Sequence, residues 1–146
     1  KYKYAVLSII ENNSTTSYTH TGLAKATYYK YLVQAYKMVD GKAQILATSK
    51  TVYAATKGGK DGNVTSLKAK SKVSLKKGKK TTLKVTVKKS GKNFAKYRKI
   101  AFESGNTKIA TVTNKGVIKG KKKGTCYIYV YAQNGVYAKV TVKVKK

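Results

Sequence analysis

The chain has 146 residues, of which 41% are hydrophobic, a fraction that excludes a disordered protein and leaves room for one large or two small domains. It carries 33 lysine and arginine residues against four acidic residues, and its net charge of +29 predicts attraction to polyanions. No apolar run approaches the length needed to span a bilayer and no signal segment opens the chain, so we expect a soluble fragment with no membrane partner.

The first segment, residues 1–56, has the pattern of strands and turns. Residues 2–9 predict a strand, in which Tyr2, Tyr4 and Val6 alternate with Ala5, Leu7 and Ile9, and the pattern leaves its inward face open. Period-two alternation resumes over residues 29–36. The turn signal Asp40-Gly41 then predicts a hairpin that returns the chain through residues 44–54.

This segment resembles the second half of a fibronectin type III domain, of the kind found in surface proteins of low-GC Gram-positive bacteria. In that family a leucine stands six residues before a tyrosine, and the strand then reads Y-x-Y-x-V-x-A-Y. The matching positions here are Leu23, Tyr29, Tyr31, Val33, Ala35 and Tyr36. The resemblance implies that the Tyr29 hydroxyl turns back to the backbone near Leu23.

The family's first strands, including one that usually carries a core tryptophan, would precede Lys1, and the chain has no tryptophan. We therefore expect the first domain to be incomplete at its N-terminus. Its inner face around Tyr31, Val33 and Ala35 should be partly uncovered. We expect it to be covered by sequence missing from this fragment or by a second copy of the chain, which would make the fragment a homo-oligomer.

Residues 57–63 contain three glycines and no large apolar residue, as is typical of a linker. The linker is short, so we expect two modules that lie end to end.

The second segment, residues 64–146, ends in a strongly patterned hairpin. One face of its first strand carries Cys126, Ile128, Val130 and Ala132, and the other face carries Tyr127, Tyr129 and Tyr131. After the turn signal Asn134-Gly135, residues 136–144 alternate in the same way. The apolar face must be covered by a second sheet, which predicts a β-sandwich of about seven strands.

The second segment also resembles the bacterial immunoglobulin-like group 2 domains. The matching positions are Ile100, Phe102, Ser104, Ile109 to Val112, Asn114, Gly116, Ile118, Gly120, Gly124 and Thr125. Phe102 stands where many members have tryptophan. The predicted fold class is therefore all-β, with two immunoglobulin-like sandwich modules in tandem. The resemblance implies a non-catalytic extracellular module, of a kind repeated in adhesins, cell-wall enzymes and phage structural proteins, and it names no ligand.

Candidate catalytic and metal-binding residues are few. The four acidic residues are scattered along the sequence, which argues against a catalytic carboxylate pair. Cys126 has the parity of the buried face, and His20 lies in a turn rich in serine and threonine without a second ligand nearby. We expect no catalytic residue, no metal and no cofactor.

One candidate ligand surface remains, on the outward side of the final hairpin. It consists of Tyr127, Tyr129, Tyr131, Tyr137, Lys139 and Lys143. An aromatic row with lysines can stack on sugar rings and pair with phosphates or uronic acids. The alternative is that tyrosine and lysine serve only as outward-facing strand residues, with lysine stems lying over the rings.

The basic residues are almost all lysines, and Arg98 is the sole arginine. Lysine is a hydrated point charge without the bidentate geometry of arginine, so we expect no specific nucleic acid partner. We call these lysines, which are spread over outward strand positions and turns, the lysine coat. They either protect strand edges and keep the domain soluble, or bind polyanions. The sequence favours an extracellular stalk or spacer that associates with anionic cell-wall polymers; the alternative is an adhesion module that binds carbohydrate or glycosaminoglycan through the tyrosine and lysine face.

Overall fold

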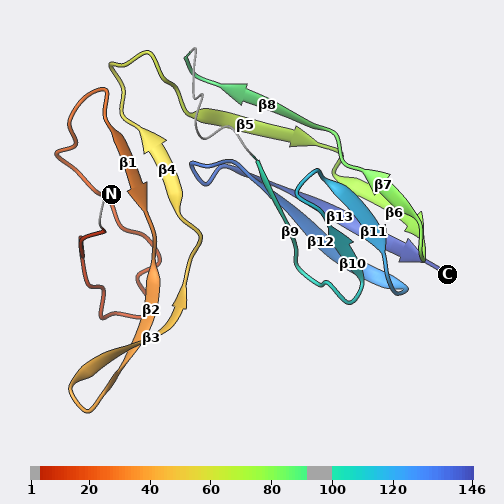
Figure 1. Ribbon diagram of the computed structural model, residues 1–146, viewed down its shortest axis with the longest axis horizontal. Coiled ribbons are helices and arrows are strands. Elements are labelled where there is room, and N and C mark those ends of the chain that lie inside the picture. Colours follow the sequence, from red (N-terminus) through yellow and green to blue (C-terminus); the bar gives the residue numbers. More distant parts are fainter. Residues whose placement is uncertain (1–3, 92–99) are drawn as a thin grey trace.

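The computed structural model describes residues 4–91 and 100–146, and within them every regular element is a strand (Figure 1). The all-β prediction is confirmed. Because the described residues contain no helix, none of them offers a helix long and apolar enough to cross a membrane. The strands of the first segment are β1 (Tyr28–Tyr31), β2 (Gln34–Val39), β3 (Lys42–Thr48) and β4 (Val52–Ala55). Those of the second segment are β5 (Val64–Ala69), β6 (Lys72–Lys76), β7 (Lys80–Thr82), β8 (Val85–Lys89), β9 (Ala101–Ser104), β10 (Ala110–Val112), β11 (Val117–Gly120), β12 (Gly124–Tyr131) and β13 (Tyr137–Lys145).

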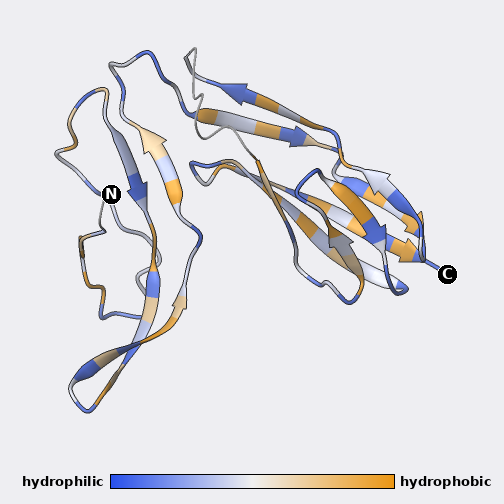
Figure 2. Ribbon diagram, in the orientation of Figure 1, coloured by the Kyte–Doolittle hydropathy of each residue, from blue (hydrophilic) through white to orange (hydrophobic). Residues whose placement is uncertain are grey.

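The second segment forms a sandwich of two sheets. One sheet has the strand order β6-β13-β12-β9, in which β13 and β6 run parallel, and the other has the order β10-β11-β7. Strands β5 and β8 pair as a separate ribbon that lies beside the larger sheet (Figure 1), and Val64 and Leu67 of β5 contribute to the core. Orange, hydrophobic stretches recur along the strands of both sheets (Figure 2), and their buried side chains form one continuous core.

The parity predicted for the final hairpin is confirmed. The β12–β13 register places Ile128 opposite Val140, Cys126 opposite Val142 and Val130 opposite Ala138. Ile128 and Val140 are fully buried. Burying a side chain of this size stabilises the fold by about 1.5–3 kcal/mol, so the two strands supply a large share of the core.

Two turns take the backbone conformations that their sequences predict. Asp40 and Gly41 both have positive φ, 49° and 73°, as a two-residue type I′ hairpin requires. In the β12–β13 loop, the Ala132 N–H donates to the Val136 carbonyl at 2.8 Å. Gly135 in that loop has φ of 85°, which fits a three-residue loop that ends in a left-handed glycine.

Leu83, Val85 and Val87 alternate with lysine and threonine, a pattern that predicts one strand, but this stretch is divided between two sheets. Strand β7 pairs with β11, whereas β8 pairs with β5. Leu83 lies between them, buried, and its N–H donates to the Gly116 carbonyl at 2.9 Å. The chain therefore crosses from one partner to another at a core residue, and alternation alone does not reveal that crossing.

The strand predicted over residues 2–9 is wrong for its described part, because residues 4–9 are exposed and form no strand. A strand needs a neighbour to complete its backbone hydrogen bonds. Here the Tyr4 hydroxyl bonds to the Thr51 hydroxyl at 2.8 Å, but no strand pairs with this stretch in the described part of the chain.

The rest of the first segment consists of two ribbons, β1–β4 and β2–β3. None of its described residues, 4–56, is buried, and the Val33 side chain is 72% exposed. Val33 and Ala35 are thus exposed, as predicted, whereas Tyr31 is half-buried; the incomplete first domain and self-association through this face stay predictions. The Tyr29 hydroxyl accepts a hydrogen bond from the Ala24 N–H at 3.1 Å, beside Leu23, as predicted.

Residues 57–63 form a closed loop, because the Asn63 side chain returns to the end of β4. Asn63 Oδ1 accepts from the Ala55 N–H at 3.0 Å, and Asn63 Nδ2 donates to the Ala55 carbonyl at 2.8 Å. Strand β4 also reaches the β12–β13 loop, where the Tyr53 N–H donates to the Gln133 carbonyl at 2.6 Å. These bonds tie the first segment to the sandwich and limit bending at the junction.

The burial of Ile128 leads to a test of the sandwich. We expect Ile128→Ala to lower the free energy of unfolding by about 2–5 kcal/mol, because it leaves a cavity between two sheets. Thr125→Ala, at an exposed position on the same strand, should change it by less than about 1 kcal/mol. Urea unfolding followed by circular dichroism measures both, and equal unfolding midpoints would contradict the assigned parity.

The loop at residues 57–63 generates a second prediction. A Cβ on Gly62 would overlap the Ser90 carbonyl oxygen, so Gly62→Ala forces one of two backbones to move. Overpacking of this kind costs about 1–3 kcal/mol. The control is Gly105→Ala, where an added Cβ meets nothing closer than 3.4 Å. We expect a lower thermal midpoint only for Gly62→Ala; a midpoint unchanged from wild type would show that the loop is not packed in this way.

Candidate functional site

The outward face of strands β12 and β13 brings the four predicted tyrosines together. Tyr131 lies opposite Tyr137 in the register, and Tyr129 lies opposite Lys139. Ring centroids are 6.0 Å apart for Tyr129 and Tyr131, 6.1 Å for Tyr131 and Tyr137, and 6.4 Å for Tyr129 and Tyr137. These rings form one cluster, which we call the tyrosine face; it also includes Tyr127, described next.

Tyr127 extends the tyrosine face toward the far end of β12. Its ring centroid is 6.4 Å from that of Tyr129. Lys139 Nζ lies 4.0 Å from the centroid of the Tyr127 ring, a cation–π contact across the two strands. One lysine of the predicted surface is therefore part of the cluster.

Lys143, the second predicted lysine, is not brought into the cluster. It lies opposite Thr125, one outward position beyond the pair formed by Tyr127 and Thr141. Within the described part of the chain it makes no ring contact. It can serve only as a separate positive charge at the end of the row.

Two tyrosines of this face are more exposed than the other two. We call Tyr127 and Tyr137, the first and last in sequence order, the end rings, and Tyr129 and Tyr131 the middle rings. Tyr127 and Tyr137 are 41% and 60% exposed, whereas Tyr129 and Tyr131 are half-buried. Tyr129 and Tyr131 are also nearly parallel, with ring planes 16° apart. The middle rings thus stabilise the sheet surface, and the end rings are the ones that a ligand can contact.

Two residues beside the tyrosine face were not predicted as part of it. Glu103 on β9 lies opposite Tyr129, and its carboxylate pairs with Lys50 Nζ at 3.0 Å. Lys50 comes from the connection between β3 and β4, 53 positions away, so no local pattern identifies the pair. Both side chains are at least half exposed, and such an ion pair contributes little stability, about 0–1 kcal/mol.

The Glu103 carboxylate also acts on the tyrosine face. Burial raises the pKa of the Tyr131 phenol, and Glu103 and Tyr129 raise that pKa further, while Lys50 opposes them. The phenol therefore stays protonated and neutral at physiological pH. It can donate a hydrogen bond but offers no activated nucleophile.

The other two singled-out residues have structural roles. His20 Nδ1 is hydrogen-bonded to the Tyr31 hydroxyl at 2.9 Å, and the His20 ring meets Tyr29 and Tyr31 edge to face. Cys126 is a buried free thiol in the core, as predicted, and burial raises its pKa. Among residues 4–91 and 100–146, no three His, Cys, Asp or Glu side chains gather as a metal site would require.

Comparison with known proteins found a family model and a relative that each match half or more of this chain. Residues 63–144 match the family model of the bacterial Ig-like domain (group 2), which is more than half of the chain. A kappa-carrageenase of Pseudoalteromonas carrageenovora is 42% identical over 74 residues. That match spans 50% of this chain but only 18% of the enzyme.

Solved structures with a similar fold belong to a surface layer protein, SbsC. Its domains 4 and 5 align with a TM-score of 0.51 and 22% identity, covering 88% of this chain and 82% of that one. A longer SbsC structure, rSbsC(31-844), aligns with the same TM-score and 23% identity, covering 86% of this chain and 21% of that one. At this identity the likeness concerns the fold alone, and it agrees with an immunoglobulin-like architecture.

Proposed function

We propose, from the premise that this chain belongs to the family of bacterial Ig-like domains (group 2), that it is a non-catalytic structural and adhesion module of an extracellular bacterial protein. The observation that carries the proposal is the family match over a sandwich whose interior is filled by aliphatic side chains. A filled core leaves the outward strand faces and loops to carry any function.

The relatives support a modular role. The matched part of the kappa-carrageenase is a small fraction of that enzyme, as expected for a module that accompanies other domains. The fold likeness to two consecutive domains of a surface layer protein extends over 88% of this chain, well beyond the second segment. It supports the proposal that residues 1–56 are part of a second immunoglobulin-like module and that the protein is exposed on a cell surface or secreted. That this module is of the fibronectin type III kind and that the cell is Gram-positive rest on the sequence resemblance alone.

The junction between the two segments favours a spacer. Asn63, Tyr53 and Lys50 each bond across it. A connection with several hydrogen bonds bends less than a free glycine-rich linker, so the two segments are restricted to a narrower range of relative orientations. That property suits a stalk.

The charge favours attachment to anionic cell-wall polymers such as teichoic acids. The chain has 33 basic residues, and of its four carboxylates Glu103 is paired with Lys50. Such an excess raises the local concentration of polyanions at the surface. Because nearly all the charge is lysine, attraction is expected without selectivity for a planar partner.

Salt tests this attachment. We expect the chain to bind immobilised wall polymer at low ionic strength and to be released steeply between about 50 and 200 mM salt, since screening and counterion release dominate such binding. A neutral polymer such as dextran is the control and should retain none of it. Failure to bind the wall polymer at 50 mM salt would contradict the proposed attachment.

The tyrosine face supports a second candidate, an adhesion module that binds carbohydrate or glycosaminoglycan. The specific observation is the exposure of the two end rings, Tyr127 and Tyr137, with Lys139 between them in the cluster. Aromatic rings stack on the C–H faces of sugars, and this contact is insensitive to salt.

Replacing the end rings separates the two candidates. We expect Tyr127→Ser with Tyr137→Ser to abolish any glycan binding that survives 0.5 M salt, because that fraction depends on ring contact. Tyr18→Ser is the control, since Tyr18 is 52% exposed on the first segment. Glycan-array binding measures both variants, and salt-resistant binding that is equal in all three proteins would exclude the tyrosine face.

A further inference from the structure

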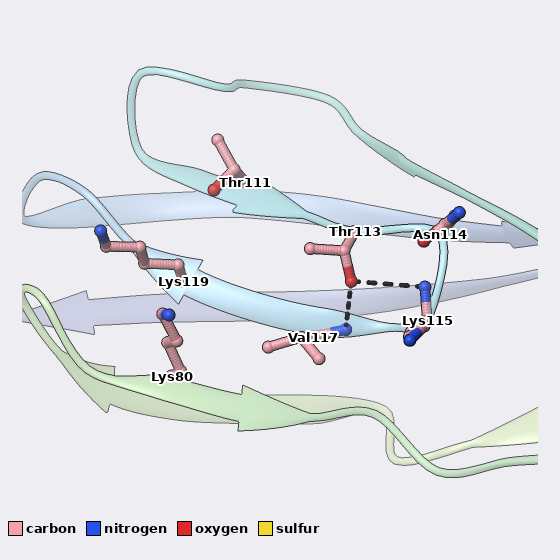
Figure 3. A pocket seen from close by; sticks show the side chains of 7 residues that line it. All are labelled: Lys80, Thr111, Thr113, Asn114, Lys115, Val117 and Lys119. Carbon is pink, nitrogen blue, oxygen red and sulfur yellow. Dashed lines mark hydrogen bonds between the residues drawn. The ribbon is translucent and has the colours of Figure 1, made fainter.

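The outer face of the β10–β11–β7 sheet carries an open groove of about 480 Å³, on a different sheet from the tyrosine face (Figure 3). Three strands and the β10–β11 turn form its walls. The lining residues are Lys80, Thr111, Thr113, Asn114, Lys115, Val117 and Lys119.

Two lysines stand side by side at one end of this groove. The strand register places Lys119 on β11 directly opposite Lys80 on β7, and opposite Thr111 on β10. The three side chains therefore form one outward row across the sheet, as Figure 3 shows. Like charges directly opposite each other destabilise a sheet.

No carboxylate among the lining residues offsets this repulsion. The chain's four acidic residues are Glu11, Asp40, Asp61 and Glu103, and none lines the groove. A bound anion would relieve the repulsion between Lys80 and Lys119. An anion bound at this row therefore removes the repulsion between the two lysines in addition to pairing with each charge, which an anion at an isolated surface lysine does not do.

The other end of the groove is held by a defined turn. Thr113 Oγ1 accepts hydrogen bonds from the Lys115 N–H at 3.3 Å and the Val117 N–H at 3.2 Å (Figure 3). The Thr113 N–H donates in turn to the Val117 carbonyl at 3.0 Å. These bonds fix the backbone that carries Lys115, so a third lysine is presented at a set place.

An apolar position separates the two charged ends. Val117 lies two residues from Lys119 on the same strand, so its side chain points to the same side about 6.6 Å away. The charged ends of the groove are thus separated by a distance on the order of 10 Å. A ligand that fills the groove has one charged group at each end and a neutral unit over the valine.

We propose that this groove binds a polyol phosphate, a linear polymer in which phosphodiesters alternate with neutral, carbon-rich units. Lys80, Lys119 and Thr111 stand in one row across the sheet, from which two ammonium groups and a hydroxyl can donate to one phosphate, which has acceptor oxygens in several directions. A planar carboxylate is better matched by the fork of an arginine, and the groove has none. The inference rests on the proposed attachment to anionic wall polymers and assigns it to one site.

Two double variants with the same change in net charge test this site. The groove variant is Lys80→Gln with Lys119→Gln, and the control is Lys68→Gln with Lys88→Gln, both exposed on the β5–β8 ribbon. With poly(glycerol phosphate) as the probe at about 50 mM salt, calorimetry should show binding weakened at least about 10-fold in the groove variant and less than about 3-fold in the control.

A measurement without polymer verifies that the groove variant folds and tests the repulsion independently. At low salt, the groove variant should have a higher thermal midpoint than wild type, because two facing charges are gone, and 0.5 M salt should remove the difference. A groove variant that is no more stable than wild type at low salt would overturn the claim that the two lysines repel.

The outcomes separate the site from the wider proposal. Equal weakening in the groove and control variants would overturn the groove and leave attachment through the whole lysine coat standing. No binding of poly(glycerol phosphate) by the wild-type chain would overturn both. Tighter groove-dependent binding of polygalacturonate than of poly(glycerol phosphate) would overturn the assignment to phosphate.

Discussion

The pairing of β12 with β13 is the constraint on which the sandwich depends. Their register sets Ile128 against Val140 and Cys126 against Val142, so every second side chain of both strands enters the core. A slip of one residue would turn the tyrosines inward and the aliphatic side chains into water. The burial of one face thus fixes the exposure of the other, and the tyrosine face is its direct consequence.

The same constraint decides where function can lie. Valine, isoleucine and leucine fill most of the core, and the two candidate surfaces lie on the outward faces of opposite sheets. The tyrosine face offers rings with one associated lysine, whereas the groove offers lysines around a single valine. The tyrosine face is suited to contact with sugar rings, and the groove is suited to binding anionic groups. Ligand affinity at the two surfaces is therefore expected to depend differently on salt concentration.

Features that are set by residues close together in the sequence could be predicted from the sequence. The parity of residues 125–144 and the Asp40-Gly41 turn follow from short-range spacing. The bond from the Ala24 N–H to the Tyr29 hydroxyl is what the resemblance to fibronectin type III domains implies. The pairs Lys50 with Glu103 and Lys80 with Lys119 join residues far apart in the chain, and only the fold brings them together. The failed strand over residues 4–9 shows the converse, since alternation without a partner strand forms no sheet.

The pairing of the strands determines which lysines of the lysine coat face each other. Lysine at outward positions protects the sheet edges from pairing with other chains, but facing lysines on neighbouring strands repel. Where a lysine faces a neutral residue, as Lys143 faces Thr125, the coat carries little electrostatic strain. Where lysines face each other, as Lys80 faces Lys119 and Lys76 faces Lys145, the repulsion is local and a bound anion relieves it. The surface is basic throughout, but its affinity for anions therefore differs from place to place. The β-sheet register, more than the net charge, determines where a polyanion is held.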